Sequence, residues 1–506
     1  MKHLVLLIGV LFTGSTWVIS AVTPAKIFSD HMVLQRDVAV PIWGKANAGA
    51  FVTVSFAGQL VKAKADKEGR WKLKLEPMKA SSKGRSLIIT SDDERILIED
   101  VLIGDVWFAG GQSNMDFKVK GLAHRLSEGK ELADSANYPA IRHRKVNERN
   151  AALPQSDLTG GNWVICTPKN VHGFSGVAFV FSRRLHLELK VPIGVIDCAW
   201  GGTPIEPYVP VEAFKGHPTL VKLAALAKAG NFEAIKKMPG GTFVRSPAWL
   251  VGAIYNGRIA PVAPYGICGA IWYQAESNCG KGEDPRDYAH KQRALIKGWR
   301  KAFNHKDLPF YYVQLPQWKS YAWTYARQEQ LAAMNVPHTG MAVTIDLDNA
   351  NDIHPPNKIE VGERLALWPL AKLYGQKKAF CGPIYKNVKI QDSRIIVYFN
   401  HAEQGLMTGR IEGIGKIVED KNGTLNGFDL VGTDGQWHPA IAKIKGQALV
   451  VSSPQVKQPV AVRYACHPDT TRDCQWNLYN MAGLPASPFC SDWNRMPYDP
   501  KLNPMH

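Results

Sequence analysis

Ser113 follows a glycine pair at the end of an apolar segment, Asp105-Val-Trp-Phe-Ala-Gly-Gly-Gln-Ser-Asn-Met-Asp116. The apolar residues are typical of a buried strand, and the two glycines allow a sharp turn after it. We therefore expect the Ser113 hydroxyl to project from the C-terminal edge of a sheet, where a nucleophile can act. Met115 stands where the G-x-S-x-G elbow of ordinary α/β-hydrolases has its last glycine. A capping serine at a strand-to-helix turn is the structural alternative.

Three further peptides have glycines or polar residues where strands are expected to end. Asp197-Cys-Ala-Trp-Gly-Gly-Thr203 contains Gly202, whose backbone N–H can approach a ligand closely. Trp272-Tyr-Gln-Ala-Glu-Ser-Asn278 ends in side chains that donate and accept hydrogen bonds. Asn351-Asp-Ile-His-Pro-Pro-Asn357 contains His354 in a proline-restricted loop.

Together these peptides supply the groups that acyl transfer to a serine requires. Ser113 needs a base to remove its proton, and His354 can serve because its ordinary pKa is about 6.5. Fixed N–H donors stabilise the oxyanion of the tetrahedral intermediate by about 3–4 kcal/mol each. The candidate donors are the backbone amides of Ser113 and Gly202 and the side-chain amide of Asn278.

Each residue also has a structural alternative. A histidine before two prolines is often a loop or capping residue, Asn278 is a common turn former, and Glu276 can be an ion-pair partner. Their occurrence at successive strand ends nevertheless favours a catalytic site. The polar side chains of Gln112, Gln274 and Glu276 are the ones that we expect to contact substrate.

The period of the apolar residues divides the chain into three regions. Residues 22–100 alternate with period two between turns, which predicts an antiparallel β-sandwich. Residues 101–376 alternate strands with helices, which predicts an α/β domain with a mostly parallel sheet and a ligand site beyond its strand ends. Residues 377–506 return to strands and predict a small β domain. Strands of the central region are expected at 105–109, 192–199, 269–273, 310–315 and 341–345, and helices at 218–229, 288–303, 325–334 and 358–374.

Composition is that of a globular protein of several domains, with 506 residues, 45% hydrophobic and 21% charged. Residues 1–21 have the pattern of a secretory signal peptide, and no later apolar run reaches the length of a membrane span, so we expect an exported periplasmic or extracellular protein. The net charge of +17 comes from scattered residues. This distribution favours a basic surface over a nucleic-acid site, and it suits an anionic sugar.

The eight cysteines show no C-x-x-C or Cys/His ligand spacing, so no zinc site is predicted. Cys466 and Cys474 are close enough in sequence to suggest a local disulfide bridge, although spacing alone does not fix the pairing.

Three of these motifs carry a resemblance to a known family. Gly111-Gln-Ser-Asn-Met115, Tyr273-Gln-Ala-Glu-Ser-Asn278 and Asp352-Ile-His-Pro355 resemble the signature blocks of the sialate O-acetylesterases, a branch of the SGNH hydrolases. The likeness extends over most of the chain after residue 21. It includes Phe28-Ser-Asp-His-Met-Val-Leu-Gln-Arg36, Ile254-Tyr-Asn-Gly257 and Gly483-Leu-Pro-Ala-Ser-Pro-Phe489.

The resemblance implies an SGNH-like three-layer central domain in which Ser113 is the nucleophile and His354 the general base. It makes Gly202 and Asn278 oxyanion donors beside the Ser113 amide. The implied reaction is hydrolysis of O-acetyl esters of sialic acid through an acetyl-enzyme, without a metal or an organic cofactor.

Two positions depart from the family pattern. The wider SGNH pattern has an aspartate three residues before the histidine, where this chain has Asn351, and Asp352 stands only two before it. Asp352 is the candidate that orients His354, but a backbone carbonyl or another carboxylate could do so and leave a Ser–His dyad. Ala275 occupies a position that is often glycine.

The leading hypothesis is therefore a secreted serine esterase acting on O-acetylated sialic acid or a similar acetylated sugar. The alternative is an acetyl esterase of acetylated xylan or another polysaccharide. A third hypothesis, a carbohydrate-binding protein with a vestigial central site, is disfavoured by the intact serine, histidine and asparagine set. The expected partner is an acetylated sugar or glycan, and no oligomeric state is predicted.

Overall fold

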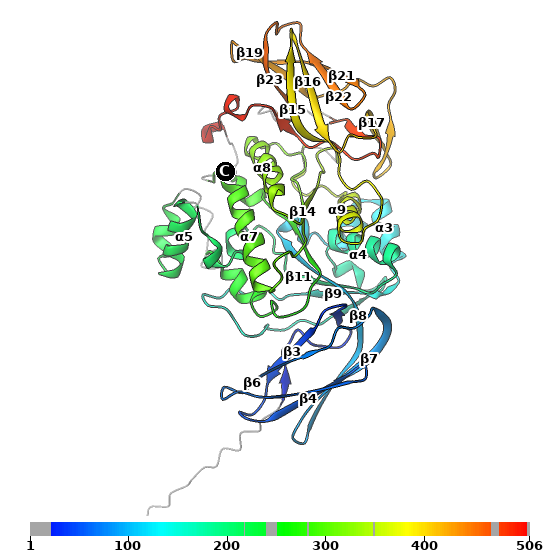
Figure 1. Ribbon diagram of the computed structural model, residues 1–506, viewed down its shortest axis with the longest axis vertical. Coiled ribbons are helices and arrows are strands. Elements are labelled where there is room, and N and C mark those ends of the chain that lie inside the picture. Colours follow the sequence, from blue (N-terminus) through cyan, green and yellow to red (C-terminus); the bar gives the residue numbers. More distant parts are fainter. Residues whose placement is uncertain are drawn as a thin grey trace, which may run out of the picture.

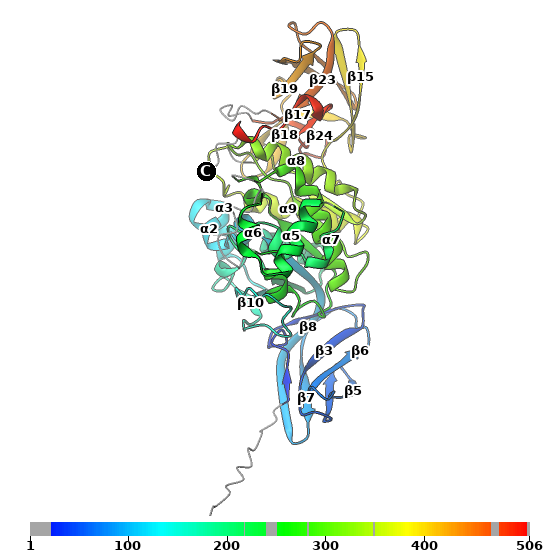
Figure 2. The same cartoon turned by 90° about the vertical axis from the view of Figure 1, so that its left-hand side faces the viewer.

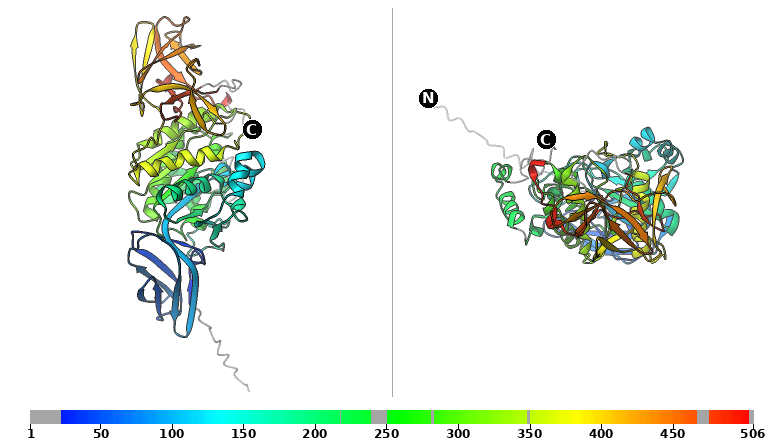
Figure 3. Two further views of the ribbon diagram at one scale, coloured as in Figure 1. Left: turned by 90° about the vertical axis from the view of Figure 1, so that its right-hand side faces the viewer. Right: turned by 90° about the horizontal axis from the view of Figure 1, so that it is seen from above.

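The computed structural model describes residues 22–216, 218–238, 250–280, 283–347, 350–466 and 475–502. These residues form an elongated molecule with a β region at each end and an α/β region between them (Figure 1; Figure 3). The predicted signal peptide at 1–21 lies outside the described residues. None of the helices in the described ranges combines the length and the apolar character that crossing a membrane requires.

The central region is built on a mixed sheet with the strand order β10-β9-β11-β8-β12-β13-β14. Its strands are β8 (Glu94–Gly111), β9 (Tyr138–Lys145), β10 (Val164–Cys166), β11 (Ile193–Asp197), β12 (Gly269–Tyr273), β13 (Phe310–Val313) and β14 (Thr339–Ala342). All neighbours are parallel except β9 and β10, which are antiparallel. The carboxyl ends of the parallel strands therefore meet at one edge of the sheet.

Helices cover both faces of this sheet. The helices of the central region are α1 (Ser113–Asp116), α2 (Val119–Arg125), α3 (Ser127–Asp134), α4 (Gly176–Leu189), α5 (Pro218–Lys228), α6 (Phe232–Lys236), α7 (Tyr288–Ala302), α8 (Tyr321–Ala332) and α9 (Lys358–Lys372). Successive side chains of a strand point to opposite faces. On β8, Trp107 packs against Phe181 of α4 and Phe108 packs against Trp299 of α7. Neighbouring residues of one strand thus bind helices on opposite sides.

The C-terminal region is made of small sheets, whereas the N-terminal region combines one small sheet with strands that extend the central sheet. In the N-terminal region β1 (Thr23–Pro24), β3 (Val40–Lys45) and β6 (Arg70–Leu75) form one sheet, and β2 (Val33–Gln35), β4 (Phe51–Phe56), β5 (Gln59–Lys64) and β7 (Ser81–Ser91) join the first part of β8. The C-terminal sheets contain β15 (Ile384–Gln391), β16 (Arg394–Asn400), β17 (Leu406–Glu412), β18 (Lys416–Glu419), β19 (Phe428–Gly432), β20 (Trp437–Pro439), β21 (Ile441–Lys445), β22 (Ala448–Ser452), β23 (Pro459–Tyr464), β24 (Leu478–Asn480) and β25 (Phe489–Cys490). Each C-terminal pair is antiparallel.

The sequence did not predict strand β9 or helix α4. β9 buries three consecutive charged or polar side chains, including those of Arg142 and Arg144, and so lacks the apolar alternation of an ordinary strand. Helix α4 is buried over most of its first eight residues, and that continuous apolar run hides the helical period. Cys466 is buried and Cys474 lies outside the described residues, so their bridge stays a prediction.

Candidate active site

Ser113 begins helix α1 directly after strand β8 ends at Gly111. Gly111 has φ +136°, and a Cβ atom there would lie 2.1 Å from the carbonyl oxygen of Tyr273 on the neighbouring strand β12. Only glycine fits this turn without moving the backbone. The turn leaves Ser113 half-buried at the carboxyl edge of the sheet, and its amide is one of the first helical N–H groups, which have no acceptor within the helix.

The structure brings His354 to Ser113 across 241 residues of sequence. The Nε2 atom of His354 lies 2.8 Å from the hydroxyl oxygen of Ser113. Burial lowers the pKa of His354, and the nearby positive charge of Lys358 lowers the pKa further. The neutral imidazole, the form that accepts a proton, therefore predominates down to a lower pH than for an exposed histidine.

Asp352 lies beside His354 but does not hold its ring. One carboxylate oxygen of Asp352 accepts a hydrogen bond from the backbone N–H of His354 at 2.8 Å, and the other binds the guanidinium of Arg125. Burial raises the pKa of Asp352, but the hydrogen bonds from Arg125 and His354 outweigh it, and the pKa is lowered. The described residues provide no hydrogen-bond partner for Nδ1 of His354. The spacing of two residues explains this arrangement, because it turns the carboxylate back onto the backbone of the same loop.

Two side chains that the sequence analysis did not single out hold the histidine loop in place. Asn114, the residue after Ser113, donates from Nδ2 to the carbonyl oxygen of Ile353 at 3.0 Å. Arg125 of α2 donates to the carbonyl oxygen of His354 at 2.8 Å. These bonds join the loop to α2 and to the segment that carries Ser113, so they restrain the distance between Ser113 and His354.

The glycine turn after β11 lies next to Ser113. A Cβ atom added to Gly201 would lie 3.8 Å from the Cβ atom of Ser113. Gly202 has φ +73°, and its carbonyl oxygen accepts a hydrogen bond from the hydroxyl of Ser277 at 3.0 Å. The turn is thus tied to the peptide after β12, which also carries Asn278.

Asn278 is buried in the 3-10 helix η7 (Glu276–Cys279), with a relative exposure of 1%. Its side-chain oxygen accepts hydrogen bonds from the Ile205 backbone at 3.0 Å and from Gln274 at 2.9 Å. Its side-chain nitrogen lies 3.1 Å from both carboxylate oxygens of Glu206. The orientation of this amide is therefore set by Ile205, Gln274 and Glu206, and Glu283 interacts with it as well.

The three side chains predicted to contact substrate are buried and bound to protein atoms. Gln112, Gln274 and Glu276 have relative exposures of 4%, 0% and 3%. Gln274 donates to the side-chain oxygens of Gln112 at 3.0 Å and Asn278 at 2.9 Å. Glu276 accepts from Asn114 at 2.6 Å, and burial raises the pKa of its carboxyl group. These residues connect the strand ends to one another and are placed away from solvent.

A buried ion cluster lies behind Asn278. Lys291 of α7 binds Glu206 at 2.7 Å and Glu283 at 3.2 Å, and all three side chains are at least nine-tenths buried. Burial raises the pKa of Glu206, but the charge of Lys291 outweighs it, and the pKa is lowered. Burial, together with the neighbouring charge of Glu206, raises the pKa of Glu283 to about 7 despite Lys291. Glu206 is thus an ionised acceptor that holds the Asn278 amide.

Ala275 follows β12 at a position that is often glycine in the family that this chain resembles. Its backbone is strained. Ala275 has φ +157°, a backbone conformation that residues other than glycine rarely adopt. Its N–H donates to Glu276 at 2.9 Å, and its carbonyl accepts from the Asn278 N–H at 3.0 Å. The strained residue thus lies between a buried carboxyl group and the candidate oxyanion donor.

Comparison with known proteins identifies relatives along nearly the whole chain. The family model described as carbohydrate esterase, sialic acid-specific acetylesterase, matches residues 103–368. The sialate O-acetylesterase of Rattus norvegicus is 30% identical over 524 aligned residues, which cover 92% of this chain and 93% of that protein. The sialate O-acetylesterase of Homo sapiens is 28% identical over 516 residues, covering 92% and 91%.

A solved structure has the same overall architecture. The crystal structure of a carbohydrate acetylesterase from Xanthomonas citri superposes with a TM-score of 0.81 at 32% identity. It covers 93% of this chain and 100% of the other. The similarity therefore includes both terminal β regions as well as the sheet that carries Ser113.

Proposed function

Because the chain belongs to the sialic acid-specific acetylesterase family of carbohydrate esterases, we propose that it removes O-acetyl groups from sialic acid by serine catalysis at Ser113. Membership makes the protein a carboxylic ester hydrolase. The 2.8 Å contact between the Ser113 hydroxyl and His354 Nε2 is the observation that carries the assignment of the site.

In the proposed mechanism, His354 removes the proton of Ser113 while the serine oxygen attacks the acetyl carbonyl carbon. The resulting imidazolium then donates its proton to the sugar oxygen, and the alcohol leaves. A water molecule, deprotonated by His354, attacks the acetyl-serine and releases acetate. These steps use only side chains and water, so they require no metal and no organic cofactor.

The proposed oxyanion donors are the backbone amides of Ser113 and Gly202 and the side-chain amide of Asn278. An amide nitrogen carries two hydrogens. Glu206 accepts at equal distances with both of its oxygens, so one hydrogen of Asn278 can serve the carboxylate and the other the developing oxyanion. Ionised Glu206 also polarises the amide that it holds, so we assign it a positioning role in catalysis.

We propose that His354 and Ser113 work as a Ser–His dyad. Asn114 and Arg125 hold the loop that carries His354. Asp352, the predicted third member, acts in this proposal through the backbone of His354 and through its charge. Gln112, Gln274 and Glu276 act in it as supports of the peptides that carry Ser113 and Asn278. Their burial and their contacts with one another support this role.

The substrate in the leading proposal is O-acetylated sialic acid, because the rat and human relatives are named sialate O-acetylesterases. The net charge of +17 favours an anionic sugar over a neutral one. The Xanthomonas citri neighbour is named more broadly as a carbohydrate acetylesterase. That name supports the second candidate, an esterase of acetylated xylan or another acetylated polysaccharide.

The decisive experiment measures acetate released from 9-O-acetylated N-acetylneuraminic acid, from acetylated xylan and from p-nitrophenyl acetate. The wild-type protein is expected to cleave the sialate ester with the highest kcat/KM, and Ser113→Ala to release no acetate above background. Preference for xylan would replace the sialate proposal with the polysaccharide one. Unchanged turnover by Ser113→Ala would contradict the assignment of the nucleophile.

We further propose that residues 22–100, 101–376 and 377–506 act as an N-terminal β-sandwich, an SGNH-like three-layer catalytic domain and a C-terminal β domain. Parallel strands with helices on both faces support the layered description of the centre. Export to the periplasm or the extracellular space, after cleavage near residue 21, is proposed from the sequence pattern alone.

A further inference from the structure

A cavity of about 470 Å³ lies between α8, the 3-10 helix η8 (Pro285–Asp287) and the C-terminal segment that contains η10 (Trp493–Arg495). The C-terminal segment runs beside α8 in two perpendicular views (Figure 1; Figure 2). Helix η8 follows the peptide that ends in Asn278, and α8 packs against both η7 and η8. The cavity therefore lies at the carboxyl edge of the central sheet, the same edge as Ser113.

Aromatic rings form much of the cavity wall. The ring of Tyr325 lies 5.7 Å from that of Trp493 and 5.0 Å from that of Tyr498. The hydroxyl groups of Tyr321 and Tyr325 donate to the carbonyl oxygen of Pro497 at 2.8 Å and 3.2 Å. These bonds hold the C-terminal segment on α8, so the cavity is preformed, while Trp493 is only partly buried.

Polar side chains with unused hydrogen-bonding capacity complete the lining. Within the part of the chain that the structure describes, the side-chain amides of Gln328 and Asn494 have no hydrogen-bond partner. Among the described residues, Glu329 accepts one hydrogen bond, a long one of 3.4 Å from the Ala289 backbone. Two amides and a carboxyl group beside aromatic rings provide donors and acceptors for hydroxyl groups and flat apolar surface for a sugar ring.

The cavity carries little net charge. Arg286 lines it, but its guanidinium binds both oxygens of Asp284, at 2.9 Å and 2.7 Å. Burial raises the pKa of Glu329 to about 7, so this carboxyl group is partly protonated at neutral pH. An uncharged ligand therefore suits the lining better than an anion or a cation.

We propose that this aromatic cavity binds uncharged pyranose units of the glycan that carries the ester, with Trp493 as the stacking surface and Gln328 and Asn494 as hydroxyl partners. A volume of about 470 Å³ lies within the usual range for ligand sites, about 300–1,000 Å³. The inference rests on the proposed function, because it makes a sugar chain rather than a free monosaccharide the preferred substrate.

The test measures binding of two sugars without ester groups, lactose and xylohexaose, by tryptophan fluorescence and calorimetry. Lactose represents the sugars to which sialic acid is attached in sialyllactose, and xylohexaose represents a polysaccharide backbone. We expect saturable binding of one of them at millimolar concentrations or below. Trp493→Ala should abolish it, Trp493→Phe should retain part of it, and Asn494→Ala should weaken it several-fold.

Tyr398→Ala provides a matched control, because Tyr398 is an exposed aromatic residue on β16, a strand that does not line the cavity. This variant should bind the sugar as the wild type does. Trp493→Ala should also hydrolyse p-nitrophenyl acetate at the wild-type rate while its KM for an acetylated oligosaccharide rises. Failure of both sugars to bind the wild type would overturn the inference and leave the esterase proposal intact. The same conclusion would follow if Trp493→Ala and Asn494→Ala both bound the sugar as tightly as the wild type. Absence of ester hydrolysis by the wild type would instead contradict the proposed function.

Discussion

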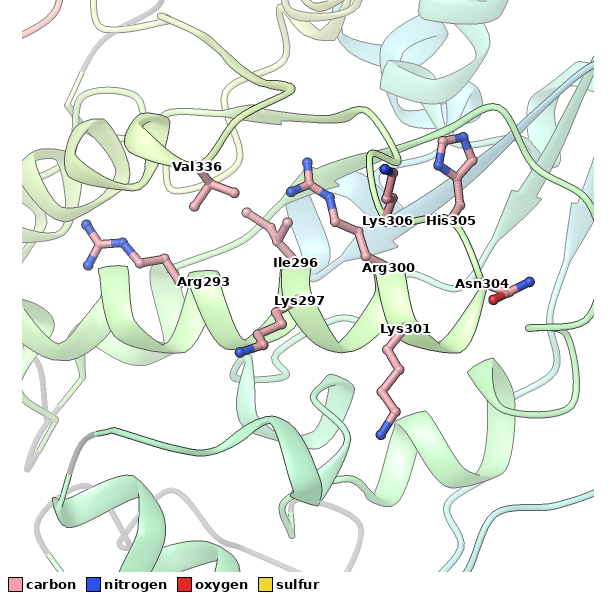
Figure 4. Close-up of a pocket in the computed structure, with 9 residues that line it drawn as sticks. All are labelled: Arg293, Ile296, Lys297, Arg300, Lys301, Asn304, His305, Lys306 and Val336. Carbon is pink, nitrogen blue, oxygen red and sulfur yellow. The ribbon is translucent and has the colours of Figure 1, made fainter.

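The two edges of the central sheet use charge in different ways. At the carboxyl edge, Glu206, Glu276 and Lys291 are buried, and each binds specific partners that lead to Ser113 or Asn278. At the amino edge, a cavity of about 770 Å³ is lined by cations of α7 and of the loop after it (Figure 4). Lys297 and Lys301 of this cavity are exposed.

The amino-edge cavity has a structural explanation. Arg293 donates to the carbonyl oxygen of Ala332 at 2.9 Å, and Arg300 donates to that of Pro337 at 2.6 Å. Lys301 lies in the last turn of α7, where the helix dipole favours positive charge. The comparison teaches that buried, mutually bound polar groups identify the built site, whereas a concentration of exposed charge does not.

Replacement of His354 by alanine should have the largest effect at the carboxyl edge. Loss of the base should lower kcat by on the order of 10⁵–10⁶-fold, as in other serine hydrolases. The melting temperature should change little, because His354 is a half-buried loop residue. Steady-state kinetics with p-nitrophenyl acetate and a thermal melt check both expectations. A loss below about tenfold would mean that another group serves as base.

The substitution Glu206→Gln should show how much the buried cluster of Glu206, Lys291 and Glu283 contributes to stability and to kcat. Removing one member of a buried ion pair is expected to lower the free energy of unfolding by about 3–5 kcal/mol. The misplaced Asn278 amide should also lower kcat by about 10²-fold. Denaturant unfolding and kinetics measure the two effects. Glu283→Gln is the comparison: Glu283 also interacts with Asn278, but Glu206 still accepts from that amide at 3.1 Å, so this variant should lose stability and clearly less activity than Glu206→Gln. Equal loss of kcat in both variants would refute a specific positioning role for Glu206.

The pH dependence of Asp352→Asn distinguishes a dyad from a triad. The lowered pKa of His354 places the acid limb of kcat/KM below about pH 6.5 in the wild type. The negative charge of Asp352 raises the pKa of His354, so its removal should move the limb to a still lower pH. We expect kcat to fall only a few-fold. A loss of about 10⁴-fold would show that Asp352 orients the ring after all.

The smallest effect is expected at the amino edge. Reversal of charge in Lys301→Glu should leave kcat/KM within about twofold of the wild type. It should cost about 0.3–1 kcal/mol of stability, because a negative charge is unfavourable in the last turn of a helix. Steady-state kinetics measure kcat/KM, and denaturant unfolding measures the change in stability. A large loss of activity would mean that the cations of the amino edge affect catalysis at Ser113. That result would contradict the conclusion that only the carboxyl edge contributes to the site.

The sequence predicted those parts of the molecule that have a local signal. Strand β12 was expected at 269–273 and occupies Gly269–Tyr273, and helix α9 was expected from residue 358, where it begins. The rule that parallel strands end at one edge also anticipated that Ser113 would lie beside the Gly201–Gly202 turn and the peptide of Asn278. Glycine turns and strand ends can be predicted from sequence because each is determined by residues close to it in the chain.

Contacts between distant segments were not readable in this way. The cluster of Glu206, Lys291 and Glu283 joins three separate segments, and each of these residues alone looks like an ordinary surface charge. The burial of Gln112 and Gln274 was missed because a polar residue at a strand end can face either solvent or a neighbouring strand. The contact of Asp352 with Arg125 was missed because the two residues are 227 positions apart in the sequence.

The strand that delivers Ser113 belongs to two regions at once. β8 pairs with β7 in the N-terminal region and with β11 and β12 in the centre, so the proposed boundary at residue 100 falls inside one continuous strand. The N-terminal β region is consequently not an exchangeable module. A truncation at this boundary would remove pairing partners from the strand that ends beside Ser113, so the two regions are expected to fold, and to be inherited, as one unit.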